Sequence, residues 1–411
     1  MYRRRSIKRL LYALPLLLST SCSSTKAPES KEQLKLGALL PITGAFVPGS
    51  TFETALQLAI EDANASQGTN TRKVSLIIKD TKSTPEGATQ AAQELLDEGV
   101  QLIVGAVLSS ATKAALNVTI PAGALLISGG STSPSLTNVD NQGLFFRTAP
   151  RDDRLAKAFG KYLAANGVNE FALIANDSIF TRDIADITQD TFEKQDCGLQ
   201  PCSYARYTYP ESTPPDDPIL DDLVKAALKS NPEVIFISGY AEDTASIIAR
   251  AEALSFQGTY FMTAAFSTTG GLEVSSLEVR KRLNWIDFGP RHGEGHKRFM
   301  ERASARIGAT APLLLAPTYD AAMLLILAVH HARSTDPALV AQSLWKVANQ
   351  PGQKVSKSEL TASIDSLHEG NEIDYEGLTL VEFDQFGDST SGQARINRVD
   401  DNGMTITEII D

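Results

Sequence analysis

Short apolar runs alternate with longer amphipathic segments along most of this chain, and this alternation constrains the fold more than any other feature. Four runs in the first part are predicted to be buried strands: 34–40, 74–78, 101–105 and 124–128. Three segments between them have helical spacing: 52–65, 85–96 and 111–120. Strands that alternate with helices indicate βαβ units, so we expect parallel sheets with helices on both faces.

The pattern restarts after Arg147. Predicted helices cover 152–166, 184–194 and 243–254, and predicted strands cover 171–175, 234–238 and 259–262. The Pro-rich segment 210–218 is predicted to be a surface loop. The sequence therefore predicts an α/β fold with two doubly wound, Rossmann-like lobes. Ligands bind at the carboxyl ends of the strands in such sheets, so two lobes that face each other predict a cleft.

Length and charge agree with two domains and argue against a nucleic-acid partner. The chain has 411 residues, of which 42% are hydrophobic, and this is too long for one compact domain. Its net charge is −11, whereas a nucleic-acid-binding protein normally presents a basic face. The densest basic cluster is Arg3–Arg5, which has another explanation.

That cluster begins a segment typical of a secretory signal peptide. It is followed by the apolar run 10–18 and by small residues up to Cys22. The apolar run is about half of the roughly 20 residues that a membrane-spanning helix needs. We therefore expect residues 1–22 to direct export and residues 23–33, which are polar and without pattern, to form a tether.

The end of this segment resembles a bacterial lipobox, in which Cys22 would become the first mature residue and carry a lipid. The match departs from the usual pattern at Ser19, where a leucine is expected. The alternative is an ordinary signal peptide that is cut nearby. If Cys22 is lipidated, Cys197 and Cys202 remain as a pair, and an even remainder in an exported protein predicts a disulfide.

Six segments together resemble the type I periplasmic substrate-binding proteins, specifically the branched-chain amino-acid (leucine-binding) receptors of ABC importers. They are 36–44, 104–112, 127–134, 146–153, 317–322 and 375–379 with 383–388. The resemblance implies that the chain crosses between the lobes three times. It places one lobe at 34–147 plus 289–380 and the other at 148–288 plus 381–411.

The resemblance also implies which residues hold a ligand carboxylate, namely Ser109, Gly130 and Thr132. A carboxylate that leaves water needs several directed hydrogen bonds. Small residues let backbone N–H groups approach it, and a helix N-terminus after Ser109 adds a favourable dipole. The alternative is that these residues serve only as a helix N-cap and a turn.

The resemblance also implies aromatic contacts to the ligand from the other lobe. Phe180 stands where the family usually has a Tyr-Gly pair, and Tyr240 matches the second aromatic position. Phe46 and Phe266 would add to an apolar surround for the ligand. For Phe180, a place in the hydrophobic core is the alternative.

The main departure from the family lies at Ala265, where amino-acid receptors have an acidic residue for the ligand ammonium. A buried ammonium without a carboxylate would cost several kcal/mol. Two hypotheses follow: Asp177 or Glu242 replaces the missing acid, or the ligand is a carboxylate without a free amino group.

We therefore expect a small-carboxylate receptor that serves an ABC permease. The alternative is a lipoprotein that uses this fold as a ligand sensor or as an activator of cell-wall synthases. An enzyme is not expected: Gly-x-Ser-x-Gly, Walker and Gly-x-Gly-x-x-Gly motifs are missing, and His292–His296 is predicted to be an exposed loop. No cofactor or metal is expected. The expected location is the periplasmic side of a membrane, and Ser23 favours the outer membrane.

Overall fold

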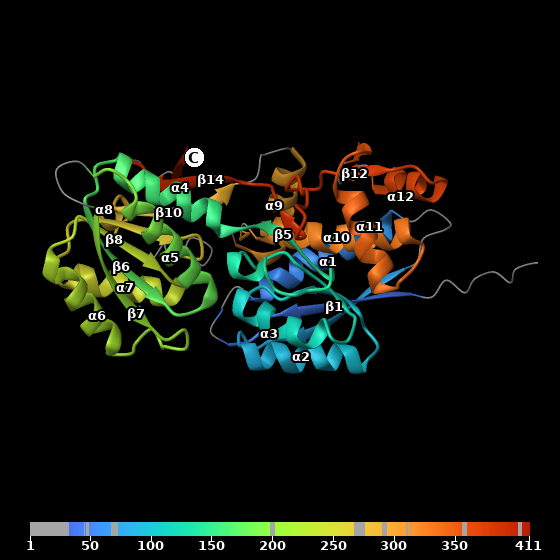
Figure 1. The fold of residues 1–411 in the computed structure, drawn as a ribbon, viewed down its shortest axis with the longest axis horizontal. Helices are drawn as coiled ribbons and strands as arrows, with labels where there is room; N and C mark the ends of the chain where they lie inside the picture. Colours follow the sequence, from blue (N-terminus) through green and yellow to red (C-terminus); the bar gives the residue numbers. More distant parts are fainter. Residues whose placement is uncertain are drawn as a thin grey trace, which may run out of the picture.

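The computed structural model describes residues 33–44, 46, 49–66, 73–197, 202–266, 276–289, 294–309, 311–312, 314–355, 360–401 and 405–411. The predicted signal peptide, Cys22 and nearly all of the tether lie outside the described residues. Two α/β lobes lie side by side, and Figure 1 shows the first at the right and the second at the left. The doubly wound two-lobed fold predicted from the alternation is confirmed.

The first lobe is built on a six-stranded sheet in the order β13-β5-β4-β3-β1-β2. Its strands are β1 (Leu34–Leu40), β2 (Val74–Asp80), β3 (Leu102–Gly105), β4 (Leu125–Ser128), β5 (Phe145–Pro150) and β13 (Asp388–Ser389). Their pairings are all parallel. The order reverses between β1 and β3, so their carboxyl ends form a topological switch point.

Helices on both faces of this sheet bury its strands, which explains why the strands read as continuous apolar runs. The helices are α1 (Gly49–Ala65), α2 (Pro85–Asp97), α3 (Ser109–Thr119), α9 (Glu294–Ile307), α10 (Leu315–Ala332), α11 (Pro337–Ala348) and α12 (Leu360–Glu369), with the 3-10 turn η1 (Pro134–Leu136). A small sheet pairs β11 (Gln353–Val355) with β12 (Ile373–Tyr375). Within the described part of the chain, no helix is long and apolar enough to span a membrane.

The second lobe has a seven-stranded sheet in the order β15-β14-β10-β9-β8-β6-β7. Its strands are β6 (Glu170–Asn176), β7 (Ser203–Tyr209), β8 (Val234–Ser238), β9 (Thr259–Thr263), β10 (Leu283–Gly289), β14 (Gln393–Val399) and β15 (Thr405–Ile409). Its helices are α4 (Asp152–Ala165), α5 (Ile179–Glu193), α6 (Ile219–Ala227), α7 (Ala241–Ala253) and α8 (Leu277–Arg280), with the 3-10 turn η2 (Leu228–Ser230). One hydrophobic core lies on each face of this sheet.

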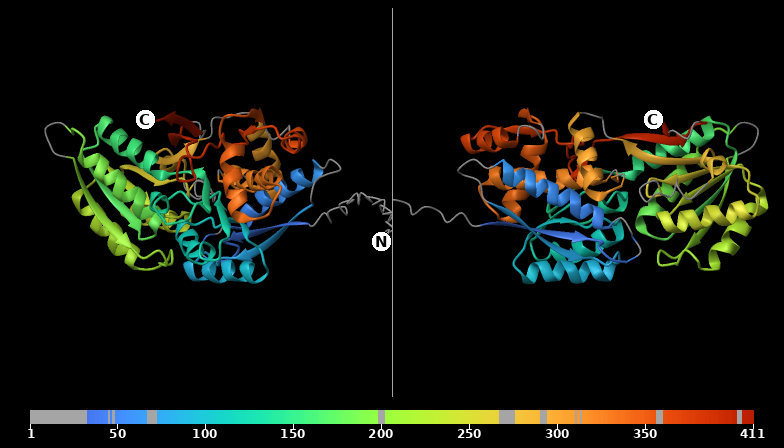
Figure 2. Two further views of the ribbon diagram at one scale, coloured as in Figure 1. Left: turned by 45° about the vertical axis from the view of Figure 1, so that its right-hand side comes forward. Right: turned by 180° about the vertical axis from the view of Figure 1, so that it is seen from behind.

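The chain passes between the lobes from β5 to α4, from β10 to α9, and from β13 to β14. Figure 2 shows β10 and β14, which pair antiparallel, at the edge where the lobes meet. The sequence analysis placed the third crossing after residue 380, and the structure corrects this. Val381 and Phe383 belong to the core of the first lobe, and β13 pairs with β5, so the chain leaves this lobe only after Ser389.

A buried ion pair explains why β13 stays with the first lobe. Arg147 on β5 is fully buried and its Nε lies 2.6 Å from Oδ1 of Asp388 on β13. The guanidinium also donates to the carbonyl of Ser133 at 2.6 Å and to the Thr137 hydroxyl at 2.9 Å. Asp388 lies in one of the family-like segments, and it serves as the partner of this arginine.

In the second lobe, Cys197 and Cys202 form a disulfide with a Cα–Cα distance of 5.2 Å. It joins the chain after α5 to the residue before β7, at the amino end of that strand rather than at the carboxyl ends that face the first lobe. The disulfide therefore stabilises a local connection of this lobe.

Candidate ligand-binding cleft

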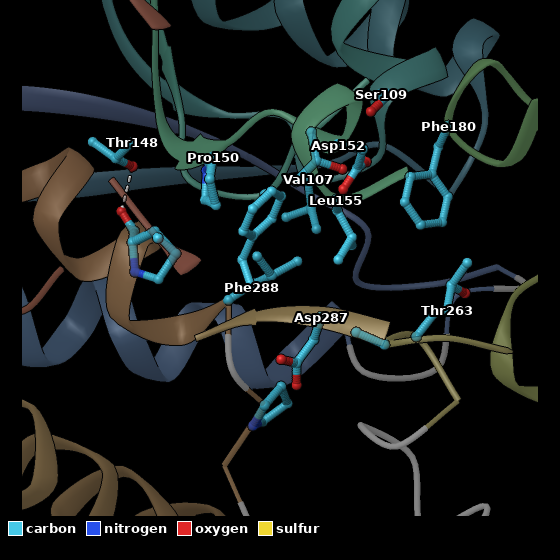
Figure 3. A pocket seen from close by; sticks show the side chains of 18 of the residues that line it. Val107, Ser109, Thr148, Pro150, Asp152, Leu155, Phe180, Thr263, Asp287 and Phe288 are labelled. Atoms are coloured by element: carbon cyan, nitrogen blue, oxygen red, sulfur yellow. Dashed lines mark hydrogen bonds between the residues drawn. The ribbon is translucent and has the colours of Figure 1, made fainter. Parts of the chain in front are cut away.

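A pocket lies between the lobes, at the carboxyl ends of strands from both sheets. It is lined from β1, β3, β4 and β5 on one side and from β6, β8, β9 and β10 on the other, together with residues near α9, α10 and the third crossing. Figure 3 shows Ser109, Asp152 and Phe180 gathered at one end and Thr148 with Pro150 toward the other. Seven of the eight sequence-predicted ligand residues line it: Phe46, Ser109, Gly130, Thr132, Phe180, Tyr240 and Ala265.

Ser109 is the first residue of α3, two residues earlier than the sequence predicted this helix to begin. The N-cap residue Leu108 has no oxygen in its side chain, so it caps no amide of the first turn. The positive end of the helix therefore points at the pocket with Ser109 at its tip. The Ser109 hydroxyl accepts a hydrogen bond from the backbone N–H of Ser133 at 3.3 Å, which holds it against the loop after β4.

The loop after β4 is fixed by hydrogen bonds within the first lobe. The hydroxyl of Ser128 donates to the Ala106 carbonyl at 2.6 Å and accepts from the backbone of Ser131 at 3.0 Å. A Cβ at Gly130 would lie 2.8 Å from the Val107 side chain, and one at Gly129 only 2.3 Å from the backbone of α10. Only glycines allow this close approach, which brings the loop backbone to the pocket wall.

Aromatic rings cover the other side of this end. Phe180, in the first turn of α5, stacks on Tyr240 with ring centroids 6.0 Å apart. Phe46 of the first lobe meets the edge of Tyr240, also at 6.0 Å. Phe180 is therefore a pocket residue that also packs against the core of its lobe. Phe266 is buried in the other core of that lobe and does not line the pocket.

The acidic residue at this end of the pocket is Asp152, which the sequence analysis did not single out for a role. It begins α4 directly after the first crossing and is only 4% exposed. Among the residues that the structure describes, its Oδ2 has no hydrogen-bond partner. Burial raises the pKa of Asp152 to about 7, against the opposing effects of the Thr132 hydroxyl and of Arg147. The available signals were its place in the family-like segment 146–153 and at the start of the predicted helix 152–166.

Neither of the two acids proposed to replace the one missing at Ala265 reaches the pocket. Asp177 accepts the backbone N–H of Glu211 at 2.7 Å and so holds the loop after β7, while Glu242 is exposed on α7. Ala265 itself lines the pocket. The acidic contribution thus comes from α4 rather than from the loop after β9, because the first crossing brings Asp152 beside Thr132.

Beside the second crossing, the pocket is lined by Phe288, Asp287 and His296. The carboxylate of Asp287 pairs with Arg395 of β14 at 2.8 Å, so its charge is neutralised within the lobe. The exposed loop predicted at His292–His296 is partly wrong: residues 294–296 open α9 and His296 is only 7% exposed. His292 lies outside the described residues. No group of three metal-binding side chains occurs in the described part of the chain.

Comparison with known proteins agrees with this architecture. A family model described as periplasmic binding protein matches residues 33–351. The chemotactic signal transduction system substrate-binding protein BasB of Halobacterium salinarum is 26% identical over 364 residues, covering 85% of this chain and 82% of that protein. The leucine-, isoleucine-, valine-, threonine-, and alanine-binding protein of Pseudomonas aeruginosa is 22% identical over 318 residues, covering 76% and 82%.

Among solved structures, the leucine-binding protein LivK of Thermotoga maritima has the same fold. It is 22% identical with a TM-score of 0.75, covering 92% of this chain and 99% of that one. The match to LivK and the family model over most of the two lobes support the resemblance drawn from the sequence motifs. This chain belongs to the periplasmic binding protein family, as a substrate-binding protein of the type I fold and not an enzyme.

Proposed function

We propose that this protein captures a free amino acid with an uncharged, bulky side chain and presents it to an ABC permease outside the cytoplasm. The observation that carries the proposal is the buried carboxylate of Asp152, with one oxygen unpartnered among the described residues, beside the donors of the first lobe. An α-carboxylate and an α-ammonium are joined through one carbon, so a ligand with both needs donors and an acid within a few ångströms of each other.

The donors for the carboxylate are the Ser109 hydroxyl, the backbone around Gly130 and the N-terminus of α3. The acceptor for the ammonium is Asp152, with the Thr132 hydroxyl beside it. A buried carboxylate with an unsatisfied oxygen is costly, and an ammonium would relieve that cost. This removes the difficulty raised by Ala265, because the ligand does not need an acid at that position.

The ligand side chain would lie against Phe46, Phe180 and Leu155, and extend toward Phe288. These surfaces are apolar, and the acid at the far end is already paired with Arg395. Leucine-like or aromatic side chains therefore suit the pocket better than charged ones. The relatives named for branched-chain amino acids support the same ligand class.

The test separates the two ends of the ligand. The chain from residue 23 is titrated with leucine, with 4-methylpentanoate, which lacks the amino group, and with 3-methylbutylamine, which lacks the carboxylate. A ligand at 100 times its Kd stabilises the native state by about 2.7 kcal/mol, which a melting curve detects. We expect leucine or a similar amino acid to raise the midpoint and both fragments to do so far less.

Variants assign the groups. Ser109→Ala should weaken binding through the carboxylate, and Asp152→Asn through the ammonium, while Asp153→Asn, the next residue on the same helix, should leave affinity nearly unchanged. If 4-methylpentanoate binds as well as leucine, or Asp152→Asn binds as well as the native chain, the amino-acid proposal is wrong. The ligand would then be a simple carboxylate.

Two finer points of the proposal rest on the sequence. Cys22 would carry a lipid that holds the receptor at a membrane, and mass spectrometry of the exported protein tests this. The lobes would move about the three crossings, from β5 to α4, from β10 to α9 and from β13 to β14.

A sensing role is the second candidate, favoured by one observation: the relative BasB is named for chemotactic signal transduction. The two roles share the ligand site and differ in the partner. Loss of uptake of the ligand on deletion of the protein supports transport, whereas intact uptake with a lost behavioural response supports sensing.

A further inference from the structure

Two carboxylates of the second lobe bond to the first lobe just outside the pocket. Glu211, in the loop after β7, accepts the hydroxyl of Ser110 on α3 at 3.2 Å. Asp183 on α5 accepts the Ser133 hydroxyl and the backbone N–H of Ser135 at 3.1 Å, both at η1. Neither acid lines the pocket.

The donors of the first lobe are neighbours of the ligand-binding residues. Ser110 follows Ser109 on α3. Ser133 follows Thr132, and its backbone N–H donates to the Ser109 hydroxyl. The second lobe therefore contacts the same strip of the first lobe that would hold the ligand carboxylate, from the outer side of that strip.

Each acid is held firmly in its own lobe. The backbone N–H of Glu211 donates to Asp177, and Oε1 of Glu211 also accepts the Tyr240 hydroxyl at 3.0 Å. Glu211 thus links Ser110 to Tyr240, an aromatic residue of the pocket. Burial raises the pKa of the Glu211 carboxyl. Asp183 lies on α5, whose first turn carries Phe180. Closing of the lobes would place each acid on its donors and each aromatic ring over the ligand in one movement.

From this geometry, and given the proposed function, we propose that Glu211 and Asp183 form a clasp that keeps the lobes closed around the ligand without touching it. In the open form water replaces the serine donors, so each contact favours closure modestly. The net value of such a bond corresponds to about a two- to tenfold change in an equilibrium constant. The clasp should act on the rate of ligand release rather than on capture, because capture precedes closure.

The test is the rate of ligand release, measured by stopped flow or surface plasmon resonance with the amino acid found to bind. Glu211→Gln and Asp183→Asn should each raise the dissociation rate about two- to tenfold, and the double variant by the product, with association nearly unchanged. Two control variants remove the same charge without removing a contact between the lobes. They are Asp216→Asn, in the loop of Glu211, and Asp186→Asn on α5, where Asp186 pairs with Arg206 of its own lobe.

A double-mutant cycle distinguishes a contact between Glu211 and Ser110 from an effect of Glu211 on folding alone. If Glu211 acts through Ser110, the variants Ser110→Ala and Glu211→Gln together should release ligand little faster than either alone. Full additivity of this pair, or an unchanged dissociation rate in the double variant Glu211→Gln and Asp183→Asn, would overturn the clasp.

A second measurement needs no ligand, so that failure of the clasp and failure of the amino-acid proposal can be told apart. Spin labels at Gln93→Cys and Lys225→Cys, both exposed and on different lobes, report the distance between lobes. The clasp predicts that the double variant Glu211→Gln and Asp183→Asn has longer distances between the two spin labels than the native chain when no ligand is bound. Identical distance distributions for the native and double-variant chains would exclude it, whatever the ligand.

Discussion

The two walls of the cleft are built in different ways. The first-lobe wall is polar and braced from behind: Ser128 and Ser131 bond to the backbone of the preceding loop, and Arg147 bonds to the carbonyl of Ser133. The second-lobe wall is aromatic and carries Phe180, Tyr240 and Ala265. A preformed polar surface offers directed bonds at little reorganisation cost, whereas an aromatic cover excludes water. The difference suggests that ligand binds the first lobe first and the second lobe then closes.

The largest expected effect comes from removing the brace of the polar wall. Arg147→Met removes the buried cation that pairs with Asp388 and leaves Thr137 and, at 3.5 Å, Arg151 beside this carboxylate. The loss should lower the free energy of unfolding by about 3–5 kcal/mol. Chemical denaturation of the native and variant chains measures this. As a control, Arg206→Met removes a partly exposed pair of the second lobe with Asp186 and should cost at most about 1 kcal/mol. Equal losses of unfolding free energy in the two variants would show that the buried ion pair behind the polar wall stabilises the protein no more than a partly exposed pair of the second lobe.

The next effect is a pH dependence that arises at Asp152, where the first crossing sets the start of α4 against the polar wall. The pKa of Asp152 is raised to about 7 by burial and by the nearby Asp183 and Asp153, against Arg147 and Thr132. Below that pH the unliganded pocket holds a neutral acid, and an ammonium must displace its proton. Affinity should therefore rise with pH up to about 7, by at most about tenfold per unit, and then level off.

Calorimetry in two buffers of different ionisation heat measures the proton released on binding at pH 6. Asp152→Asn should abolish the release, and Asp153→Asn should retain it. The same raised pKa makes the unliganded native state less stable as the pH rises from about 4 to about 7, because the native state binds this proton more tightly than the unfolded chain. Proton uptake on binding, instead of release, would contradict this account.

The smallest effect is expected at the aromatic wall. Phe180→Leu keeps an apolar surface but loses the stacking contact with Tyr240, so affinity should fall only a few-fold, since such pairs contribute about 0.5–1.5 kcal/mol. Preference should also move toward larger ligand side chains, which fill the space of the lost ring. Competition between leucine and phenylalanine on the native and variant chains checks this. A loss as large as that from Ser109→Ala would contradict the division of roles between the walls.

Most of the fold was predictable from sequence because its signals are local. Buried strands read as apolar runs, and helices between them as amphipathic segments, so every element predicted up to β9 occurs in the structure. The strands β5 and β7 and the helix α6 were not predicted. Helix starts were less accurate. α5 begins at Ile179 rather than Ile184, because the Ser178 hydroxyl caps the N–H of Thr181 and extends the helix to the pocket.

Most residues that the family motifs placed around the ligand also line the pocket; the exceptions are Asp177, Glu242 and Phe266. These residues follow strand ends, and parallel sheets bring strand ends together. The sequence by itself therefore determined two doubly wound lobes and most of the residues that line the cleft between them.

Tertiary structure alone decided which acid lies in the pocket and where the chain changes lobes. Asp152 reaches the pocket because the first crossing carries α4 back beside the loop after β4, a contact between segments with no local signal. Likewise Asp388, 241 residues from Arg147, keeps β13 in the first lobe. Burial and charge pairing are properties of long-range contacts, so a single sequence shows which side chains can ionise but not which partners they meet.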